Sequence, residues 1–217
     1  MIDKINKNKE LVESLILKGY CKERVARALL EVPREKFVRP EYSAQAYEDM
    51  PLPIGYGQTI SAPSVVAFSL ERLDVREGMN VLDIGTGSGY VAAILSFLVG
   101  KDGRVTTIER KKELLSMAKK CLSAFSYAKN IKFVLGDGTL GYGKNSPYDR
   151  IIAGAAAPEI PPPLISQLKE NGKMVIPVGD VYQDLVLYEK KGEGGQSTSI
   201  LPVIFVKMIG KFGFKEE

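Results

Sequence analysis

Three glycines at alternate positions follow an acidic residue in the segment Asp83-Ile84-Gly85-Thr86-Gly87-Ser88-Gly89. Apolar residues precede it, so the pattern predicts a buried strand, a tight turn and the start of a helix. Glycine lets the backbone turn sharply and approach a ligand closely, because it has no Cβ. The N–H groups at the start of a helix can bind an anionic group. The segment therefore predicts a ligand-binding loop formed by Asp83, Gly85, Thr86, Gly87, Ser88 and Gly89.

The spacing of these glycines narrows the class of ligand. Dinucleotide-binding loops have the spacing Gly-x-Gly-x-x-Gly, but Tyr90 occupies the place of that third glycine. No Lys-Ser or Lys-Thr pair follows the loop, which excludes a P-loop. An acidic residue two positions before Gly-x-Gly-x-Gly resembles the S-adenosylmethionine loop of Rossmann-like methyltransferases. For the loop taken alone, a glycine-rich turn without a ligand is the alternative.

Acidic residues also stand at the ends of the next two predicted strands. Residues 104–108 end at Glu109, and residues 131–135 end shortly before Asp137. The carboxyl ends of parallel strands form the ligand-binding edge of an open sheet. There Glu109 could accept hydrogen bonds from ribose hydroxyls, and Asp137 could accept one from an adenine amine. Together with the loop they predict a nucleoside-bearing cofactor, and the lack of a phosphate-binding lysine favours S-adenosylmethionine.

Strands and helices alternate along most of the chain, which predicts a Rossmann-like, doubly wound, mostly parallel sheet. After residue 184 the alternation stops, and two further strands should form an antiparallel hairpin at one edge of the sheet. An Asn-Gly pair at 171–172 should end the last helix. The predicted strands cover residues 81–84, 104–108, 131–135, 148–153, 174–178, 185–189 and 200–209. Two predicted helices begin near residues 61 and 91, and two more cover residues 111–126 and 162–169.

The first sixty residues should form a helical extension and a covering loop. Residues 9–18 and the stretch before Pro33 have the apolar spacing of two short helices. Prolines and glycines interrupt residues 33–63, whose apolar content predicts an ordered loop. Ser61 suits the N-cap of the next helix, so capping alone could explain that serine. We expect one domain, residues 1–217, with residues 1–60 as extension and cover and residues 61–217 as the cofactor-binding core.

Composition excludes several kinds of chemistry. The 217 residues include no histidine, which removes Ser-His and Cys-His mechanisms and the commonest metal ligand. Cys21 and Cys121 lack metal-ligand spacing, so no metal is expected. A net charge of +4 with scattered lysines argues against a nucleic-acid partner. No apolar run approaches the roughly 20 residues of a membrane span, and the N-terminus lacks a secretion signal, so we expect a cytoplasmic chain without a membrane partner.

Motifs spread over most of the chain carry a resemblance to one methyltransferase family. The most specific is Gly-Gln-Thr-Ile-Ser-Ala-Pro at residues 57–63, because other methyltransferases with a similar glycine loop lack it. Residues 32–38, 51–55, 83–90, 107–110, 136–138, 147–149 and 155–158 accompany it. Over these segments the chain is similar to protein-L-isoaspartate O-methyltransferases.

The resemblance implies an enzyme that methylates the α-carboxylate of L-isoaspartyl residues in damaged proteins and so starts their repair. Its cofactor would be S-adenosylmethionine, with S-adenosylhomocysteine as the product and no metal. Ser61 matches the family's active-site serine, and Thr59 and Ile60 match a segment that closes over the cofactor. The implied cofactor contacts are Ser64, Asp83, Gly85, Thr86, Gly87, Ser88, Gly89, Glu109, Arg110, Asp137 and Gly138.

Two departures from the family pattern and two alternative functions accompany this hypothesis. Many members have histidine where this chain has Ser64, and many read Val-Pro-Leu where it has Val206-Lys207-Met208. The alternatives are a methyltransferase for a small carboxylate or an RNA, and a non-catalytic cofactor-binding module. Residues 154–158 lack the Asn/Asp-Pro-Pro-aromatic motif of base and glutamine methyltransferases. A carboxylate is ionised at neutral pH and needs no general base, which agrees with the absence of histidine.

Overall fold

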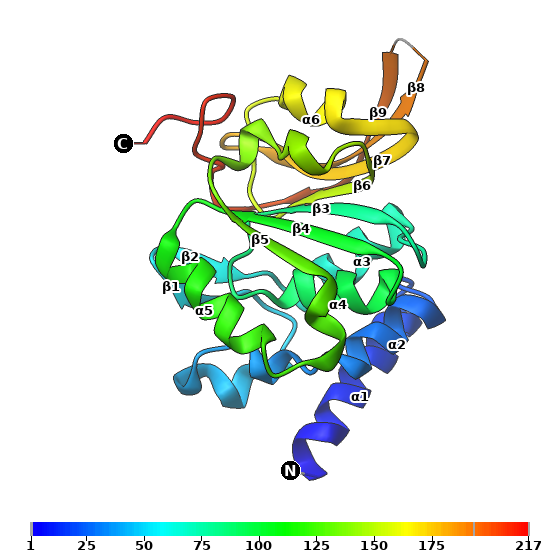
Figure 1. Cartoon of the computed structure of the whole chain (residues 1–217). Helices are drawn as coiled ribbons and strands as arrows, with labels where there is room; N and C mark the ends of the chain where they lie inside the picture. The colour runs from blue at the N-terminus through cyan, green and yellow to red at the C-terminus, as the bar shows by residue number, and fades with distance from the viewer. Residues whose placement is uncertain (1, 193, 217) are drawn as a thin grey trace.

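A seven-stranded sheet in the order β5-β4-β3-β6-β7-β8-β9 organises the chain. The computed structural model describes residues 2–192 and 194–216 (Figure 1). β3 pairs in parallel with both β4 and β6, so the strand order reverses at β3. Its side chains Val81, Leu82 and Ile84 are buried, as expected of a strand covered on both faces. The strands are β3 Asn80–Ile84, β4 Arg104–Glu109, β5 Ile131–Leu135, β6 Tyr148–Ala153, β7 Leu168–Gly179, β8 Gln183–Lys191 and β9 Gly194–Val203.

Helices cover both faces of this sheet, as a doubly wound fold requires (Figure 1). On one face α3 (Pro63–Leu73), α4 (Tyr90–Val99) and α5 (Lys112–Leu122) pack against the parallel strands. The N-terminal helices α1 (Ile2–Leu17) and α2 (Glu23–Glu31) pack together, and α2 lies against α3 and α4. On the opposite face lies α6 (Pro162–Gln167), with the short 3₁₀ helices η4 (Gly138–Leu140) and η5 (Gly143–Asn145) nearby.

The antiparallel hairpin at the sheet edge is confirmed, with a difference in length. β8 and β9 pair antiparallel, but β9 ends at Val203 rather than at residue 209. The chain then leaves the sheet edge and runs beside the turn after β6, where Lys207 forms a bridge with Ala156. This C-terminal segment therefore reaches the carboxyl ends of the parallel strands.

The predicted ordered loop before α3 contains a small hairpin that the sequence did not indicate. Its strands β1 (Leu52–Gly55) and β2 (Gln58–Ile60) pair antiparallel across a turn at Tyr56 and Gly57, which both have positive φ. The buried side chains of Leu52, Ile54 and Ile60 anchor the hairpin on the core. The 3₁₀ helices η1 (Arg34–Lys36) and η2 (Pro40–Gln45) precede it. We call residues 50–61 the cover.

The prediction that Ser61 caps α3 is wrong. The N-cap residue is Ala62, and the helix begins at Pro63. The carboxylate of Asp49 accepts a hydrogen bond from the N–H of Ser64 at 2.8 Å, which satisfies a donor of the first turn. A side chain from the preceding loop therefore provides the capping contact, and capping no longer explains the serine.

Two other helix ends also differ from the prediction. α5 ends at Leu122 rather than at residue 126, and α6 ends at Gln167. Leu168 is buried opposite Tyr148 and already belongs to β7, so Asn171-Gly172 does not close a helix. The pair lies instead in an irregular stretch of β7 between Leu168 and Lys173, where Asn171 adopts φ 60°. Across the described ranges, no helix combines the length and apolar character needed to span a membrane.

Candidate active site

Two adjoining pockets lie at the carboxyl ends of β3 and β6, where the strand order reverses. This is the position at which open α/β sheets bind ligands. The inner pocket extends from the cover to the glycine loop, and the outer pocket extends from there to the end of β4 and the C-terminal segment. Thr59, Gly85, Gly87 and Gly154 line both pockets, so the two form one continuous site.

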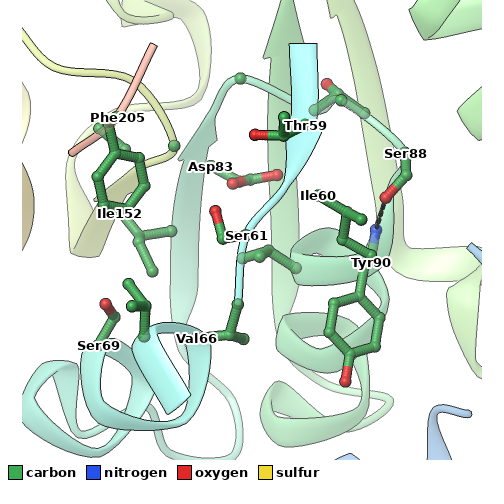
Figure 2. Close-up of a pocket in the computed structure, with 17 residues that line it drawn as sticks. Thr59, Ile60, Ser61, Val66, Ser69, Asp83, Ser88, Tyr90, Ile152 and Phe205 are labelled. Atoms are coloured by element: carbon green, nitrogen blue, oxygen red, sulfur yellow. Dashed lines mark hydrogen bonds between the residues drawn. The ribbon is translucent and has the colours of Figure 1, made fainter. Parts of the chain in front are cut away.

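The site brings together most of the residues singled out by the sequence. The inner pocket is lined by Thr59, Ile60, Ser61, Asp83, Gly85, Thr86, Gly87 and Ser88 (Figure 2). The outer pocket adds Glu109, Arg110 and Gly138. Neither pocket lining includes Ser64, Gly89 or Asp137.

The glycine loop needs its glycines for two different reasons. Gly87 has φ 52°, and a Cβ there would lie 3.3 Å from the Ile54 side chain of the cover. Gly89 has φ 88°, and a Cβ there would lie 2.9 Å from Leu122 of α5. Gly87 therefore lets the cover approach the loop, whereas Gly89 lets α5 pack against the start of α4. This packing role explains why Gly89 lies outside the pockets.

Asp83 is a buried carboxylate on the wall of the inner pocket, with a side chain only 2% exposed. Its Oδ2 accepts a hydrogen bond from the Thr107 hydroxyl at 2.7 Å, and that hydroxyl also pairs with the Thr86 hydroxyl at 2.7 Å. Its Oδ1 has no hydrogen-bond partner among the described residues. Burial raises the pKa of Asp83 to about 7; the Thr107 hydrogen bond opposes this shift and the charge of Glu109 adds to it. Such a carboxylate suits a cationic ligand group.

Glu109 connects the end of β4 to the glycine loop. Its Oε2 accepts a hydrogen bond from the N–H of Gly87 at 3.0 Å, and its Oε1 accepts one from the N–H of Lys111 at 3.0 Å. The side chain is buried but lines the outer pocket. Its carboxylate therefore faces the site from a fixed position.

The Asp137 carboxylate accepts hydrogen bonds from η4 and from the C-terminal segment. Its Oδ1 accepts hydrogen bonds from the N–H and the hydroxyl of Thr139, at 2.8 and 2.7 Å. Its Oδ2 accepts one from the N–H of Lys211 at 2.7 Å. The carboxylate thus connects η4 to the C-terminal segment, and only the neighbouring Gly138 lines the outer pocket.

The Ser61 hydroxyl points into the inner pocket, between Phe205 and Ile152 on one side and Ile60 and Tyr90 on the other (Figure 2). Among the described residues this hydroxyl has no hydrogen-bond partner, whereas the Ser61 carbonyl accepts a hydrogen bond from Arg34 at 2.7 Å. The Ser61 hydroxyl is therefore available to a ligand.

Several lining residues escaped the sequence analysis. Phe205 and Ile152 form an apolar wall, but nothing in their local sequence marks them out from other core residues. Ser69 of α3 is 5% exposed and lines the inner pocket. A polar residue within the apolar stripe of a helix is the sequence signal that could have identified it. Arg34 was also missed, because only the fold brings it to Ser61.

Comparison with known proteins identifies the family. The model of the family described as Protein-L-isoaspartate(D-aspartate) O-methyltransferase matches residues 6–213. The chain belongs to this family. A protein-L-isoaspartate O-methyltransferase of Methanothrix thermoacetophila is 50% identical over 210 residues, covering 97% of this chain and 98% of the relative. Another, from Hyperthermus butylicus, is 48% identical over 218 residues, covering 96% of this chain and 90% of the relative.

Solved structures of isoaspartate methyltransferases share the fold. One named protein-L-isoaspartate O-methyltransferase superposes with a TM-score of 0.87 at 32% identity, covering 95% of this chain and 67% of that one. Another, from Plasmodium falciparum in complex with S-adenosyl-L-homocysteine, superposes with a TM-score of 0.82 at 30% identity, covering 93% and 98%. The predicted fold and family are confirmed.

Membership of this family defines the activity of the chain. This chain is an S-adenosylmethionine-dependent carboxyl methyltransferase that acts on L-isoaspartyl residues of damaged proteins. The alternatives of a small-molecule or RNA methyltransferase and of a non-catalytic module are therefore set aside. In the part of the chain that the structure describes, no group of three or more His, Cys, Asp or Glu side chains could hold a metal ion.

Proposed function

We propose that the isoaspartyl carboxylate and the reactive end of S-adenosylmethionine meet in the inner pocket, where the Ser61 hydroxyl orients the carboxylate. The observation that carries the proposal is that this hydroxyl points into the pocket without a hydrogen-bond partner among the described residues. The capping contact at α3 comes from Asp49, so the start of the helix does not require the serine.

The pocket chemistry fits this cofactor. Oδ1 of Asp83 would face the positively charged methionine end, and the N–H of Ser88 in the glycine loop would face its carboxylate. The N–H of Thr86 donates to the carbonyl of Ile108 at 3.1 Å, so Thr86 would contribute by shaping the loop. Glu109 would accept hydrogen bonds from the ribose hydroxyls in the outer pocket. Apolar side chains of Ile108 and Met208 and the backbone of Gly138 would surround the adenine. When bound, the cofactor supplies a methyl group made electrophilic by its sulfonium.

The protein then has two tasks, orientation and exclusion of water. A hydrogen bond from Ser61 to one carboxylate oxygen leaves the other oxygen free to attack along the line of the breaking bond. This bond should be modest in strength, because a very strong one would stabilise the ground state. Alignment of this kind can lower a barrier by several kcal/mol. Phe205, Ile152 and Val66 provide the apolar wall that keeps water from the nucleophile.

The remaining predicted contacts have more indirect roles in this proposal. Thr59 and Ile60 of the cover would close over the cofactor. Residues 1–60 would serve as the extension and covering loop, and residues 61–217 as the cofactor-binding core. Arg110 lines the outer pocket and forms an ion pair with Glu216 at 2.6 Å. Ser64 and Asp137 would act by holding the cover and the C-terminal segment near the cofactor.

The partners proposed are damaged polypeptides alone, in the cytoplasm, with no nucleic acid and no membrane. A net charge of +4 without a concentrated basic face supports the first exclusion. Added RNA should therefore leave the rate of peptide methylation unchanged at low salt, and competition by RNA would contradict this part of the proposal.

A matched pair of peptides tests the proposed function. The two differ only in whether one residue is L-isoaspartate or L-aspartate, and both are incubated with the chain and S-adenosylmethionine carrying a labelled methyl group. We expect a base-labile methyl ester on the isoaspartyl peptide only, and its formation should slow strongly in Ser61→Ala. Equal labelling of both peptides would contradict the substrate assignment, and full activity of Ser61→Ala would contradict the role of the serine.

A further inference from the structure

Arg34 is a buried arginine at the base of the cover. Its side chain is 1% exposed, and its guanidinium donates hydrogen bonds to the carbonyl of Ser61 at 2.7 Å and to the carbonyl of Met50 at 3.2 Å. Its Nε is buried without a hydrogen-bond partner in the described ranges. Burial lowers the pKa of Arg34 to about 10, partly opposed by the charges of Tyr90 and Asp49. The group thus stays protonated at neutral pH.

The two carbonyls that Arg34 binds are the two ends of the cover. Met50 lies two residues before β1, and Ser61 directly follows β2. One rigid, planar group therefore fixes the spacing between the ends of the hairpin. Asp49 adds a second bond, because its carboxylate accepts the N–H of Ser64 and so fixes the chain just after Ser61. We call Arg34 and Asp49 the latch.

The latch also relates the cover to the glycine loop. The Arg34 guanidinium lies over the ring of Tyr90, with its central carbon 5.6 Å from the ring centroid. Tyr90 is the first residue of α4, follows the glycine loop directly and lines the inner pocket. Arg34 therefore contacts both the segment that carries Ser61 and the helix that begins at the cofactor loop.

A stability role alone accounts poorly for a charge at this position. Burying a guanidinium costs free energy, and an apolar side chain of similar volume would avoid that cost. Its hydrogen bonds go to backbone carbonyls and not to a carboxylate, so their effect is to define backbone geometry. We propose that Arg34, assisted by Asp49, is a positioning residue that holds Ser61 in its catalytic orientation, an inference that rests on the proposed role of Ser61.

The test compares Arg34→Lys with Arg150→Lys, each in the wild-type and the Ser61→Ala background. Lysine keeps the charge of Arg34 but cannot bridge the two carbonyls in the same way. Arg150 is a matched control, because it is 8% exposed and donates to the carbonyls of Leu73 and Asp74 at 2.6 and 3.3 Å, near the start of β6. The readouts are kcat for an isoaspartyl peptide, calorimetric Kd for S-adenosylhomocysteine, and melting temperature.

We expect Arg34→Lys to lower kcat about tenfold to a hundredfold, since small misplacements of reacting groups have effects of this size. In the Ser61→Ala background the same change should lower kcat by less than about twofold, because residues that act as a unit are not additive. Arg150→Lys should lower the melting temperature and leave kcat unchanged. Should Arg34→Lys fail to fold, Asp49→Ala replaces it, since Asp49 is exposed.

If Arg34→Lys lowers kcat by the same factor in both backgrounds, the inference is overturned. A wild-type kcat in the single variant Arg34→Lys would also overturn it. The proposed function is judged separately by Ser61→Ala alone. If Ser61→Ala is slow but the effects of the two substitutions on kcat are independent, the role of Ser61 is supported and the role of the latch is refuted.

Discussion

Replacing Glu109 with alanine should weaken cofactor binding with little effect on the fold. The structure gives this carboxylate two backbone hydrogen bonds, from Gly87 and Lys111, each at 3.0 Å. A hydrogen bond to a charged group contributes about 1.5–3 kcal/mol, so loss of the ribose contact should raise Kd by about one to two orders of magnitude. Calorimetry with S-adenosylhomocysteine measures the change. Glu113→Ala, an exposed carboxylate in the first turn of α5, is the matched control.

The same variant could weaken binding indirectly, because Glu109 also holds the N–H of Gly87. A second ligand, the 2′-deoxy analogue of S-adenosylhomocysteine, separates the two causes. If Glu109 binds the ribose, removing the hydroxyl should weaken binding to the wild type and have little effect on Glu109→Ala. Equal losses in both proteins would refute the ribose contact, and an unchanged Kd in Glu109→Ala would refute any role of the carboxylate in binding.

Three further predictions follow from buried and strained positions. The folded pKa of Asp83 is raised from 3.8 to about 7, so its contribution to stability is present below about pH 4 and is lost as the pH rises to 7. The melting temperature of the wild type should therefore fall relative to that of Asp83→Asn over this window. A difference that does not depend on pH would contradict the assignment. Gly89→Ala should lower the free energy of unfolding in urea by about 1–3 kcal/mol, because its Cβ would lie 2.9 Å from Leu122. Gly143→Ala is the control, since a Cβ at Gly143 would have nothing within 4 Å. Equal urea midpoints for the two variants would disprove the packing role of Gly89. Asn171 is exposed and followed by glycine, so an aged sample warmed with labelled cofactor should methylate itself near position 171, and labelling that persists in Asn171→Ser would place the damage elsewhere.

The sequence predicted the sheet and the glycine loop because their signals are local. Burial on both faces makes β3 a continuous apolar run, and the glycines follow directly. The acidic residue at the end of β4 could be placed at the binding edge because parallel strands share that edge.

Most of what the sequence analysis missed depends on contacts between different elements, which a local pattern does not show. Ser61 had the right residue type for a cap, but Asp49 of the preceding loop makes the contact with the helix. The bond from the Lys211 N–H to the Asp137 carboxylate joins positions far apart in the chain, so no local pattern indicated it. The cover hairpin was missed because its strands are only four and three residues long and include Pro53. Arg34 belongs to segment 32–38 of the family resemblance, but nothing in that segment marked it as the partner of Ser61.

The most direct test of the account is the single-turnover rate of Ser61→Ala on an isoaspartyl peptide at saturating cofactor. Loss of alignment of a reacting group can slow a reaction by up to about a hundredfold, so we expect a rate about tenfold to a hundredfold below wild type. The Kd for S-adenosylhomocysteine and the melting temperature should stay close to their wild-type values, since the serine does not cap α3. A wild-type rate, or a slower rate fully explained by weaker cofactor binding, would contradict the central claim that Ser61 orients the substrate carboxylate.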